Sequence, residues 1–218
     1  MAVNIVDLGV VSYADAVKKQ KEFFEKRIED RIEDTVLLLE HPPVVTLGKS
    51  ASRNNIRDYS FFASRGIEIV DTDRGGGITY HAPGQLIVYP VIKFDPPMRD
   101  VSAFIDLLEE MTAGALQDIG VSAGRRQGRR GVWVSEKKIA FIGIKLRRWV
   151  TFHGIAVNIN NDIFPFEMID PCGEADIKVT SARVLKGDEL DMGEVKKVFS
   201  KHFSNSFKKG LVDVIEIA

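Results

Sequence analysis

The sequence contains one cysteine, and this residue could act as a nucleophile. Cys172 is the single cysteine among 218 residues and stands in the tripeptide Pro171-Cys172-Gly173. Its neighbours indicate a loop that presents the side chain, whereas a lone cysteine is more often a small apolar residue of the core. A free thiol with a pKa of about 8.5 is only slightly ionised at neutral pH, so a nucleophilic role requires a nearby cation or base. The candidates are Lys138, Lys145, His81 and His153, and spacing does not choose among them.

A run of glycines supplies a second chemical feature. Arg74-Gly75-Gly76-Gly77 lets the backbone approach a ligand closely and offers amide donors to an anion or a carbonyl oxygen. The run does not match the dinucleotide fingerprint. Gly48-Lys49-Ser50 does not complete a P-loop either, because Pro43 stands where that motif needs a glycine. On the residues alone, the glycine run fits a ligand loop or a turn between two strands.

Four histidines are candidates for metal ligands or for hydrogen bonds to a substrate. They are scattered at His41, His81, His153 and His202, with no H-E-x-x-H or C-x-x-C spacing. A zinc site would need distant residues to converge, so we predict no metal and no cofactor. His81 and His153 each precede a small residue in strand-like surroundings, and either line a cleft or brace a loop.

The charge balance excludes a general surface for nucleic acid or for a membrane. Thirty basic and thirty-one acidic residues give a formal net charge of -1, which provides no global positive field. Positive charge is concentrated locally in the run Arg125, Arg126, Arg129 and Arg130, with Arg147 and Arg148 downstream. This run is either a solvated face or a docking site for an acidic protein, since no RNA-binding aromatic motif accompanies it.

No segment has the composition of a membrane span or of a secretion signal. The apolar run at residues 86–92 is far shorter than the roughly 20 residues that cross a bilayer. Residues 1–13 contain Asp7 and no basic residue, unlike a signal peptide. Together with the single cysteine, these features favour a protein of the reducing cytoplasm.

The candidate residues must be positioned by a scaffold of mixed secondary structure. Apolar and β-branched runs predict strands at residues 4–8, 35–40, 44–47, 67–71, 132–134, 138–145, 149–159 and 212–217. Helical spacing predicts helices at residues 13–34, 59–64, 101–119 and 194–203, the first opened by Ser12 and Asp15. Residues 78–81, a turn at 82–85 and residues 86–94 predict strand, tight turn and strand of one growing sheet. We therefore expect a single α+β domain over residues 1–218.

Three segments together resemble the lipoyl(octanoyl) transferase family, which attaches octanoyl groups to lipoate-dependent proteins. The first is R-G-G-G-I-T-Y-H-A-P-G-Q-L at residues 74–86, similar to the family pattern R-G-G-x-x-T-Y-H-G-P-G-Q-L. The second is G-V-W-V at 131–134 with K-I-A-F-I-G at 138–143. The third is H-G-I-A-V-N at 153–158, which runs on to Pro171-Cys172-Gly173. Ala82 and Glu174 depart from the family pattern, which has a glycine and commonly an apolar residue there.

The resemblance implies a fold shared with biotin and lipoate protein ligases, in which a mixed sheet carries helices on one side and the acyl chain enters a tunnel. It also implies that Cys172 accepts the acyl group and that Lys138 favours the thiolate of Cys172. By the same resemblance, the following residues line the acyl and substrate site: Arg74, Gly75, Gly76, Gly77, Ile78, Thr79, Tyr80, His81, Phe141, Ile142, Gly143, His153, Gly154, Ile155 and Ala156.

The implied reaction moves an octanoyl or lipoyl group from octanoyl-acyl carrier protein, through a thioester on Cys172, to an acceptor lysine. The acceptors implied are the lipoyl domains of 2-oxoacid dehydrogenases and the glycine cleavage H protein. An ATP-dependent lipoate-protein ligase is the first alternative, because its R-R-x-x-G-G-G loop is similar, but such an enzyme needs no thiol. A non-catalytic module that binds carrier protein is the second alternative. The presence of both Cys172 and Lys138 favours the transferase.

Overall fold

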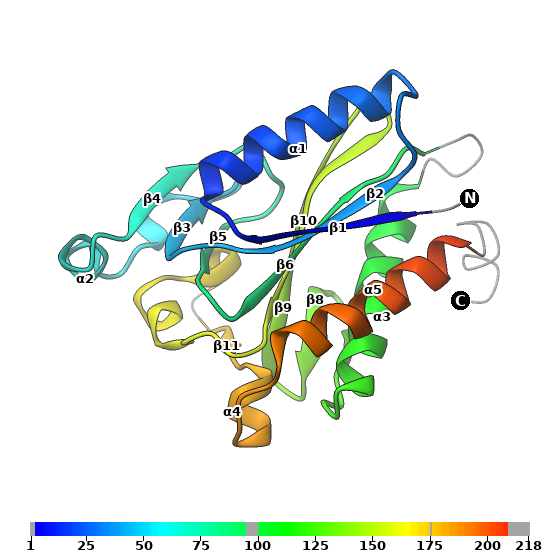
Figure 1. Ribbon diagram of the computed structural model, residues 1–218. Coiled ribbons are helices and arrows are strands. Elements are labelled where there is room, and N and C mark those ends of the chain that lie inside the picture. Colours follow the sequence, from blue (N-terminus) through cyan, green and yellow to red (C-terminus); the bar gives the residue numbers. More distant parts are fainter. Residues whose placement is uncertain (1–2, 95–99, 175, 209–218) are drawn as a thin grey trace.

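Two β-sheets of unequal size are joined in the described part of the chain (Figure 1). The computed structural model describes residues 3–94, 100–174 and 176–208. The larger sheet has the strand order β1-β2-β6-β10-β9-β8-β7, with β11 paired to β9, and the smaller sheet has the order β4-β3-β5. Both sheets mix parallel and antiparallel pairs. The predicted α+β class with a mixed sheet is confirmed.

The elements have the following bounds. The strands are β1 (Asn4–Val10), β2 (Thr35–Glu40), β3 (Val44–Leu47), β4 (Glu68–Asp71), β5 (Ile78–His81), β6 (Gln85–Val91), β7 (Gly124–Arg126), β8 (Arg129–Val134), β9 (Lys137–Arg147), β10 (Val150–Asn158) and β11 (Lys178–Val179). The α-helices are α1 (Tyr13–Ile28), α2 (Tyr59–Ser64), α3 (Val101–Asp118), α4 (Ala182–Lys186) and α5 (Met192–Lys208). Short 3₁₀ helices span Arg53–Asn55, Phe164–Met168 and Pro171–Gly173.

Most predicted elements are confirmed to within a few residues, and the exceptions have local causes. The first helix ends at Ile28 rather than near residue 34, because the chain turns at Asp30, which has a φ of 53°. Asp34 then folds back and accepts a hydrogen bond from Arg27 Nε at 2.7 Å. The short elements β7, β11 and α4 were not predicted. The strand predicted at residues 212–217 lies outside the described residues.

Helices cover both faces of the larger sheet, which corrects the expectation of helices on one side (Figure 1). Successive residues of β2 alternate between the two faces. Val36 and Leu38 belong to the core cluster built with α3 and α5, whereas Leu37 and Leu39 pack in the cluster that contains Ala16 of α1. Burial on both faces explains why β2 and β6 read as nearly continuous apolar runs.

The strands β5 and β6 do not form a hairpin, although the sequence predicts strand, turn and strand of one sheet. β5 pairs antiparallel with β3 in the smaller sheet, whereas β6 pairs with β2 and β10 in the larger sheet. The turn between them is held elsewhere, since Gly84 N donates to Glu40 Oε2 at 2.8 Å and Asn160 N donates to Gly84 O at 2.8 Å. The chain thus crosses from one sheet to the other at this turn.

The loop between β4 and β5 lies against the larger sheet and connects the two sheets a second time. Gly75 N donates to Ile144 O of β9 at 3.1 Å. A Cβ atom on Gly143 would lie 2.7 Å from Gly75 O, so the glycine in β9 allows this close approach. No helix within the described residues is long and apolar enough to cross a membrane.

Candidate active site

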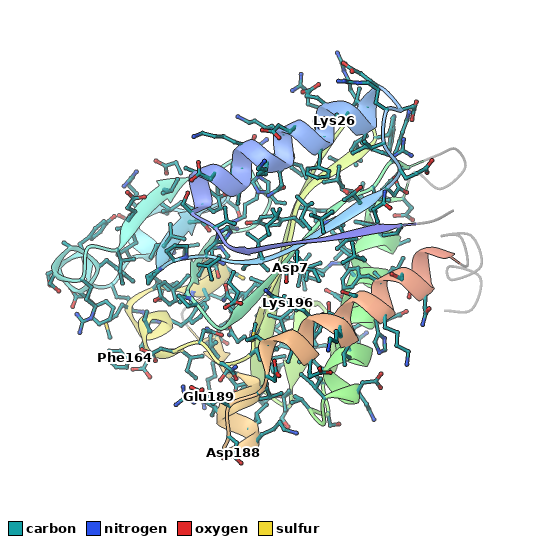
Figure 2. All side chains as sticks on the ribbon, viewed as in Figure 1. Asp7, Lys26, Phe164, Asp188, Glu189 and Lys196 are labelled. Atoms are coloured by element: carbon teal, nitrogen blue, oxygen red, sulfur yellow. The ribbon has the colours of Figure 1, made fainter. Side chains whose placement is uncertain are left out.

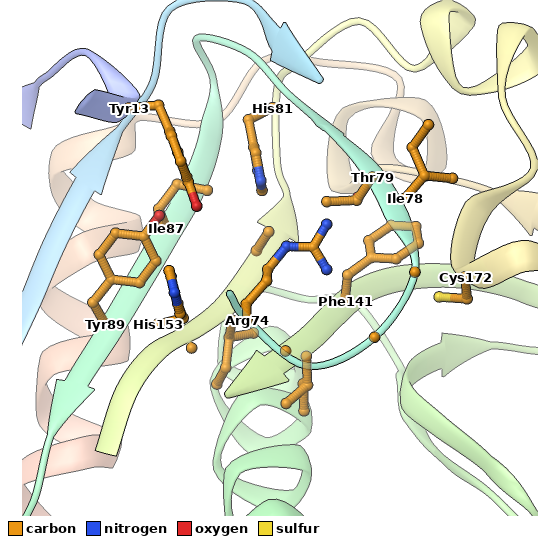
Figure 3. Close-up of a pocket in the computed structure, with 17 residues that line it drawn as sticks. Tyr13, Arg74, Ile78, Thr79, His81, Ile87, Tyr89, Phe141, His153 and Cys172 are labelled. Carbon is orange, nitrogen blue, oxygen red and sulfur yellow. The ribbon is translucent and has the colours of Figure 1, made fainter. Parts of the chain in front are cut away.

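A narrow pocket lies where the two sheets meet, and it collects most of the residues singled out in the sequence (Figure 3). Its cavity volume is about 40 Å³. The predicted residues that line it are Arg74, Gly76, Gly77, Ile78, Thr79, His81, Phe141, Ile142, Gly143, His153, Gly154, Ile155, Ala156 and Cys172. Three predicted residues do not line it. The backbone of Gly75 forms a hydrogen bond to β9, and the ring of Tyr80 packs against that of Phe166 with centroids 5.8 Å apart. Lys138 instead contacts the sulfur of Cys172.

Cys172 stands at one end of this pocket on a tightly constrained backbone (Figure 3). Its φ is 60° and that of Gly173 is 79°, so two successive residues are in the left-handed region. Such a conformation is uncommon for a residue with a side chain. A Cβ atom on Gly77 would lie 2.8 Å from Cys172 Cα, which makes Gly77 the residue that lets the two loops meet.

Lys138 is the cation that the fold places beside the thiol. Its Nζ lies 3.4 Å from Cys172 Sγ, and the residue is only 4% exposed. The ammonium also lies 4.9 Å from the ring centroid of Phe141 and 5.3 Å from that of Trp133, where aromatic faces favour a cation. Gly131 makes room for the side chain, because a Cβ atom there would lie 2.5 Å from Lys138 Cε.

The other three candidate partners of the thiol are engaged elsewhere. Lys145 forms an ion pair with Asp73. His153 Nε2 lies 2.8 Å from Asp73 Oδ1, and His81 Nδ1 lies 2.7 Å from Gln85 Oε1. Of the four candidate residues, Lys138 is therefore the one that contacts the thiol of Cys172.

Arg74 brings a positive charge into the middle of the pocket. In Figure 3 its guanidinium lies between Phe141 and the tyrosine end. Its Nη2 donates to Thr46 O at 2.7 Å and to Thr46 Oγ1 at 2.9 Å, and its Nη1 donates to Gly75 O at 3.1 Å. Burial lowers the pKa of Arg74. Neutral oxygen atoms hold this side chain in place without cancelling its charge.

A buried chain of hydrogen bonds fixes the tautomer of His81. Thr46 Oγ1 accepts from Arg74 and donates to His81 Nε2 at 3.2 Å. Nδ1 of His81 then donates to Gln85 Oε1, while Gln85 Nε2 donates to Asn158 Oδ1 at 2.8 Å. Burial holds the pKa of His81 well below its usual value, so the ring is neutral. His81 lines the pocket and braces its wall at the same time.

The far end of the pocket is closed by aromatic residues that the sequence did not indicate. Tyr13 of α1 and Tyr89 of β6 line this end together with Ile87 (Figure 3). Tyr13 donates to Thr72 Oγ1 at 2.7 Å, and Tyr89 donates to His41 Nε2 at 2.8 Å. Burial lowers the pKa of His41 to about 4, so its Nε2 is free to accept this bond. Helical or strand periodicity alone gives no sign that Tyr13 faces a pocket.

Thr79 carries a hydroxyl that is buried at the pocket without a hydrogen-bond partner among the described residues. The residue is 5% exposed. A buried hydroxyl without a partner is costly unless a ligand or water satisfies it. Thr79 is therefore a candidate to donate to an oxygen of the substrate.

The arginine run is neutralised within the chain rather than displayed as a bare positive patch. Arg125 pairs with Asp106 at 2.7 Å, and Arg126 pairs with Glu136 at 2.7 Å. The two remaining arginines also meet carboxylates: Arg129 pairs with Glu174 and Asp176, and Arg130 with Asp106 and Glu109. These ion pairs weaken the case for the run as a docking site for an acidic protein.

Relatives of known name match the chain over nearly its whole length. Residues 12–204 match the model of the lipoyl protein ligase A/B catalytic domain. The chain is 41% identical to an octanoyltransferase of Syntrophotalea carbinolica, covering 95% of this chain and 96% of the relative. It is 40% identical to an octanoyltransferase of Nitratidesulfovibrio vulgaris, covering 98% of each.

Two solved structures that share the fold are ligases of low sequence identity to this chain. A bipartite lipoate protein ligase from Thermoplasma acidophilum matches with a TM-score of 0.74 and 17% identity, over 95% of this chain and 84% of that chain. A biotin protein ligase from Aquifex aeolicus matches with a TM-score of 0.57 and 17% identity, over 99% of this chain and 74% of that chain. At this identity the likeness establishes the fold alone.

Proposed function

The chain belongs to the octanoyltransferases within the lipoyl protein ligase A/B catalytic domain family, and we propose that it moves the acyl group through a thioester on Cys172. The observation that carries this mechanism is the 3.4 Å contact between Lys138 Nζ and Cys172 Sγ at the end of the pocket. An ammonium at this distance favours the thiolate, which is the nucleophilic form of the residue. We also propose that the chain acts as a single catalytic domain.

The first step is an exchange of thioesters. Sγ of Cys172 attacks the carbonyl carbon of the donor thioester, the new sulfur–carbon bond forms, and the donor sulfur leaves. The ammonium of Lys138 gives its proton to the departing thiolate and becomes an amine. One thioester replaces another, so the step is close to balanced in free energy.

The second step forms an amide. The amine of an acceptor lysine attacks the thioester carbonyl on Cys172, and its proton passes to the neutral amine of Lys138. Cys172 leaves as a thiolate, so the lysine–cysteine pair returns to its starting state. The exchange of a thioester for an amide is downhill, so it requires no ATP.

The pocket residues bind the acyl chain and stabilise charge on its carbonyl oxygen. Ile78, Phe141 and Ile142 provide apolar surface beside Cys172. The hydroxyl of Thr79, buried without a partner among the described residues, donates to the carbonyl oxygen as negative charge develops there. Arg74 adds a fixed positive charge to the same pocket.

The partners follow from the two ends of the reaction. The donor is octanoyl-acyl carrier protein, and the acceptors are lysine residues of lipoyl domains and of the glycine cleavage H protein. The names of the relatives, which are octanoyltransferases, support this assignment. No nucleic acid and no membrane takes part.

An ATP-dependent lipoate ligase is the competing function, because the solved structures with this fold include such enzymes. Incubation with octanoyl-acyl carrier protein in the absence of ATP separates the two. We expect mass spectrometry to find an octanoyl group on the peptide that contains Cys172, and the variant Cys172→Ser to lack a thioester that hydroxylamine removes. Transfer that requires ATP and free octanoate, with no adduct on Cys172, would instead identify a ligase.

A further inference from the structure

A second cavity lies directly behind the far end of the acyl pocket. Its volume is about 90 Å³, and it is lined by Lys21, Phe24, Glu25, Asp73, Lys145, Arg147 and Phe152. His153 lines the acyl pocket, whereas its chain neighbour Phe152 lines the second cavity. The two cavities therefore share a wall at this point of β10.

Three side chains bonded to one another make this wall. His153 is 2% exposed, and its Nε2 donates to Asp73 Oδ1 at 2.8 Å. The other oxygen of Asp73 forms an ion pair with Lys145 of β9. Phe152 stands opposite Lys145 in the antiparallel register, so the strands themselves bring the parts of the wall together. We name Asp73, His153 and Lys145 the polar wall.

Two buried aromatic rings give the second cavity an apolar patch behind the polar wall. Phe24 of α1 and Phe152 meet edge to face with ring centroids 5.7 Å apart. Lys21, Lys145 and Arg147 are the cations of its lining, and long side chains of this kind cover apolar surface with their methylene groups. The second cavity therefore offers apolar surface on Phe24 and Phe152 beyond the polar wall, while Lys21, Glu25 and Arg147 open it to solvent.

We propose that the polar wall sets the upper limit on the length of the acyl chain, an inference that rests on the proposed function. The acyl pocket has a cavity volume of only about 40 Å³, so a chain must widen it as it enters. A methyl end that reaches His153 meets an ion pair and hydrogen bonds that it cannot replace. Acyl chains longer than octanoyl therefore do not pass the polar wall, although the second cavity lies beyond it.

The test removes the Asp73 carboxylate, which bonds to both other residues of the polar wall, and measures chain-length preference. Wild type and Asp73→Ala are incubated with N-acetylcysteamine thioesters of octanoate and dodecanoate, and the rate of acylation of Cys172 is followed by mass spectrometry. Each methylene that reaches apolar surface is worth up to about fourfold in binding. We expect the dodecanoyl-to-octanoyl rate ratio to rise at least about tenfold in Asp73→Ala.

A matched control lies two residues away. Asp71 forms an exposed ion pair with Arg53 at 2.7 Å and does not touch the pocket. Asp71→Ala therefore keeps the ratio of the wild type. Asp73→Ser opens nearly the same space while leaving a hydroxyl for His153, and it provides the same measurement if the alanine variant does not fold.

The outcomes separate the two proposals. An unchanged ratio in folded Asp73→Ala or Asp73→Ser, with octanoyl adduct still formed on Cys172, would overturn the role of the polar wall and leave the proposed function standing. A wild-type protein that forms no adduct with either thioester would overturn the proposed function and this inference with it. An increase in Asp71→Ala equal to that in Asp73→Ala would also contradict the inference.

Discussion

Two lysines of the same strand stand at opposite ends of the pocket and differ in what they contact. Lys138 lies 3.4 Å from the thiol of Cys172 and against two aromatic rings. Lys145, seven residues along β9, forms an ion pair with Asp73, and its side chain is 29% exposed. The residue type and the strand are shared, so the difference comes from the neighbours.

The neighbours decide whether each lysine can take part in chemistry. The charge of Lys145 is balanced by Asp73, whose pKa is lowered to about 2 by its bonds to His153 and Lys145, which outweigh the effect of burial. That carboxylate stays ionised at ordinary pH, and the pair closes the pocket. Lys138 faces a thiol, which can share a proton with it during a reaction. In the proposed mechanism the Lys138 end is therefore reactive, and the Lys145 end is structural.

Loss of the ammonium at the reactive end has the largest expected effect. Lys138→Met keeps the length of the side chain and removes its charge. We expect the rate of Cys172 octanoylation to fall about a thousandfold, equivalent to about 4 kcal/mol of barrier. Stopped reactions analysed by mass spectrometry measure it.

Lys137→Met is the matched control, because Lys137 is the exposed neighbour on the same strand.

Alkylation of Cys172 by iodoacetamide refines the comparison of the two ends. Lys138→Met slows alkylation at neutral pH, whereas Lys145→Met changes it less than about twofold. Equal slowing in both variants would show that the two ends do not differ in the way described.

Acid should weaken the structural end. Burial lowers the pKa of His153 to about 4, despite its bond to Asp73. Because the unfolded residue titrates near 6.5, its contribution to stability is complete above that pH and is lost as the pH falls to about 4. The loss is of the order of 3 kcal/mol for this residue.

Urea denaturation at pH 7 and pH 4 measures this loss. His153→Asn keeps a side chain that tolerates the φ of 61° at this position and removes the titrating ring. We expect the free energy of unfolding to depend less on pH in this variant, by about 3 kcal/mol over the interval. The same dependence in both proteins would mean that His153 is not held neutral by the fold.

Crowding at the reactive end should have a smaller effect. A Cβ atom on Gly77 would lie 2.7 Å from the backbone carbon of Cys172, so Gly77→Ala must displace the loop that holds the thiol. We expect a loss of about 2 kcal/mol in the free energy of unfolding and slower octanoylation. Gly124→Ala is the control, since a Cβ atom there meets nothing within 4 Å. A Gly77→Ala protein as stable and as active as Gly124→Ala contradicts the close approach.

Removal of the unpaired hydroxyl should have the smallest effect. Thr79→Val preserves the shape of the side chain and removes its oxygen. We expect octanoylation of Cys172 to slow about tenfold, equivalent to about 1.4 kcal/mol, with no change in its alkylation by iodoacetamide. An unchanged octanoylation rate would exclude Thr79 as a donor to the carbonyl oxygen.

Local patterns were sufficient for most of the elements and for the family. Apolar runs place β2 and β3 almost to the residue because these strands are buried along their whole length, and helical spacing does the same for α2 and α3. The motif at residues 74–86 and the Pro171-Cys172-Gly173 loop carry the family resemblance. These features depend on residues close together in the chain.

Pairing between distant residues could not be predicted in the same way. Residues 78–94 have the local pattern of a hairpin, yet β5 and β6 enter different sheets, because their partners β3, β2 and β10 lie elsewhere in the sequence. The arginine run looks like a positive surface until the fold brings Asp106, Glu136 and Asp176 to it.

The sequence by itself determined the α+β class, the family and the residues able to do chemistry, with Cys172 foremost. The tertiary structure decided which lysine meets the thiol, that Tyr13 and Tyr89 line the far end, and that Asp73 joins His153 and Lys145 there. The physical reason is distance along the chain: Lys138 and Cys172 are 34 residues apart, and Asp73 and His153 are 80 residues apart. Such contacts form only after the strands have paired into the two sheets.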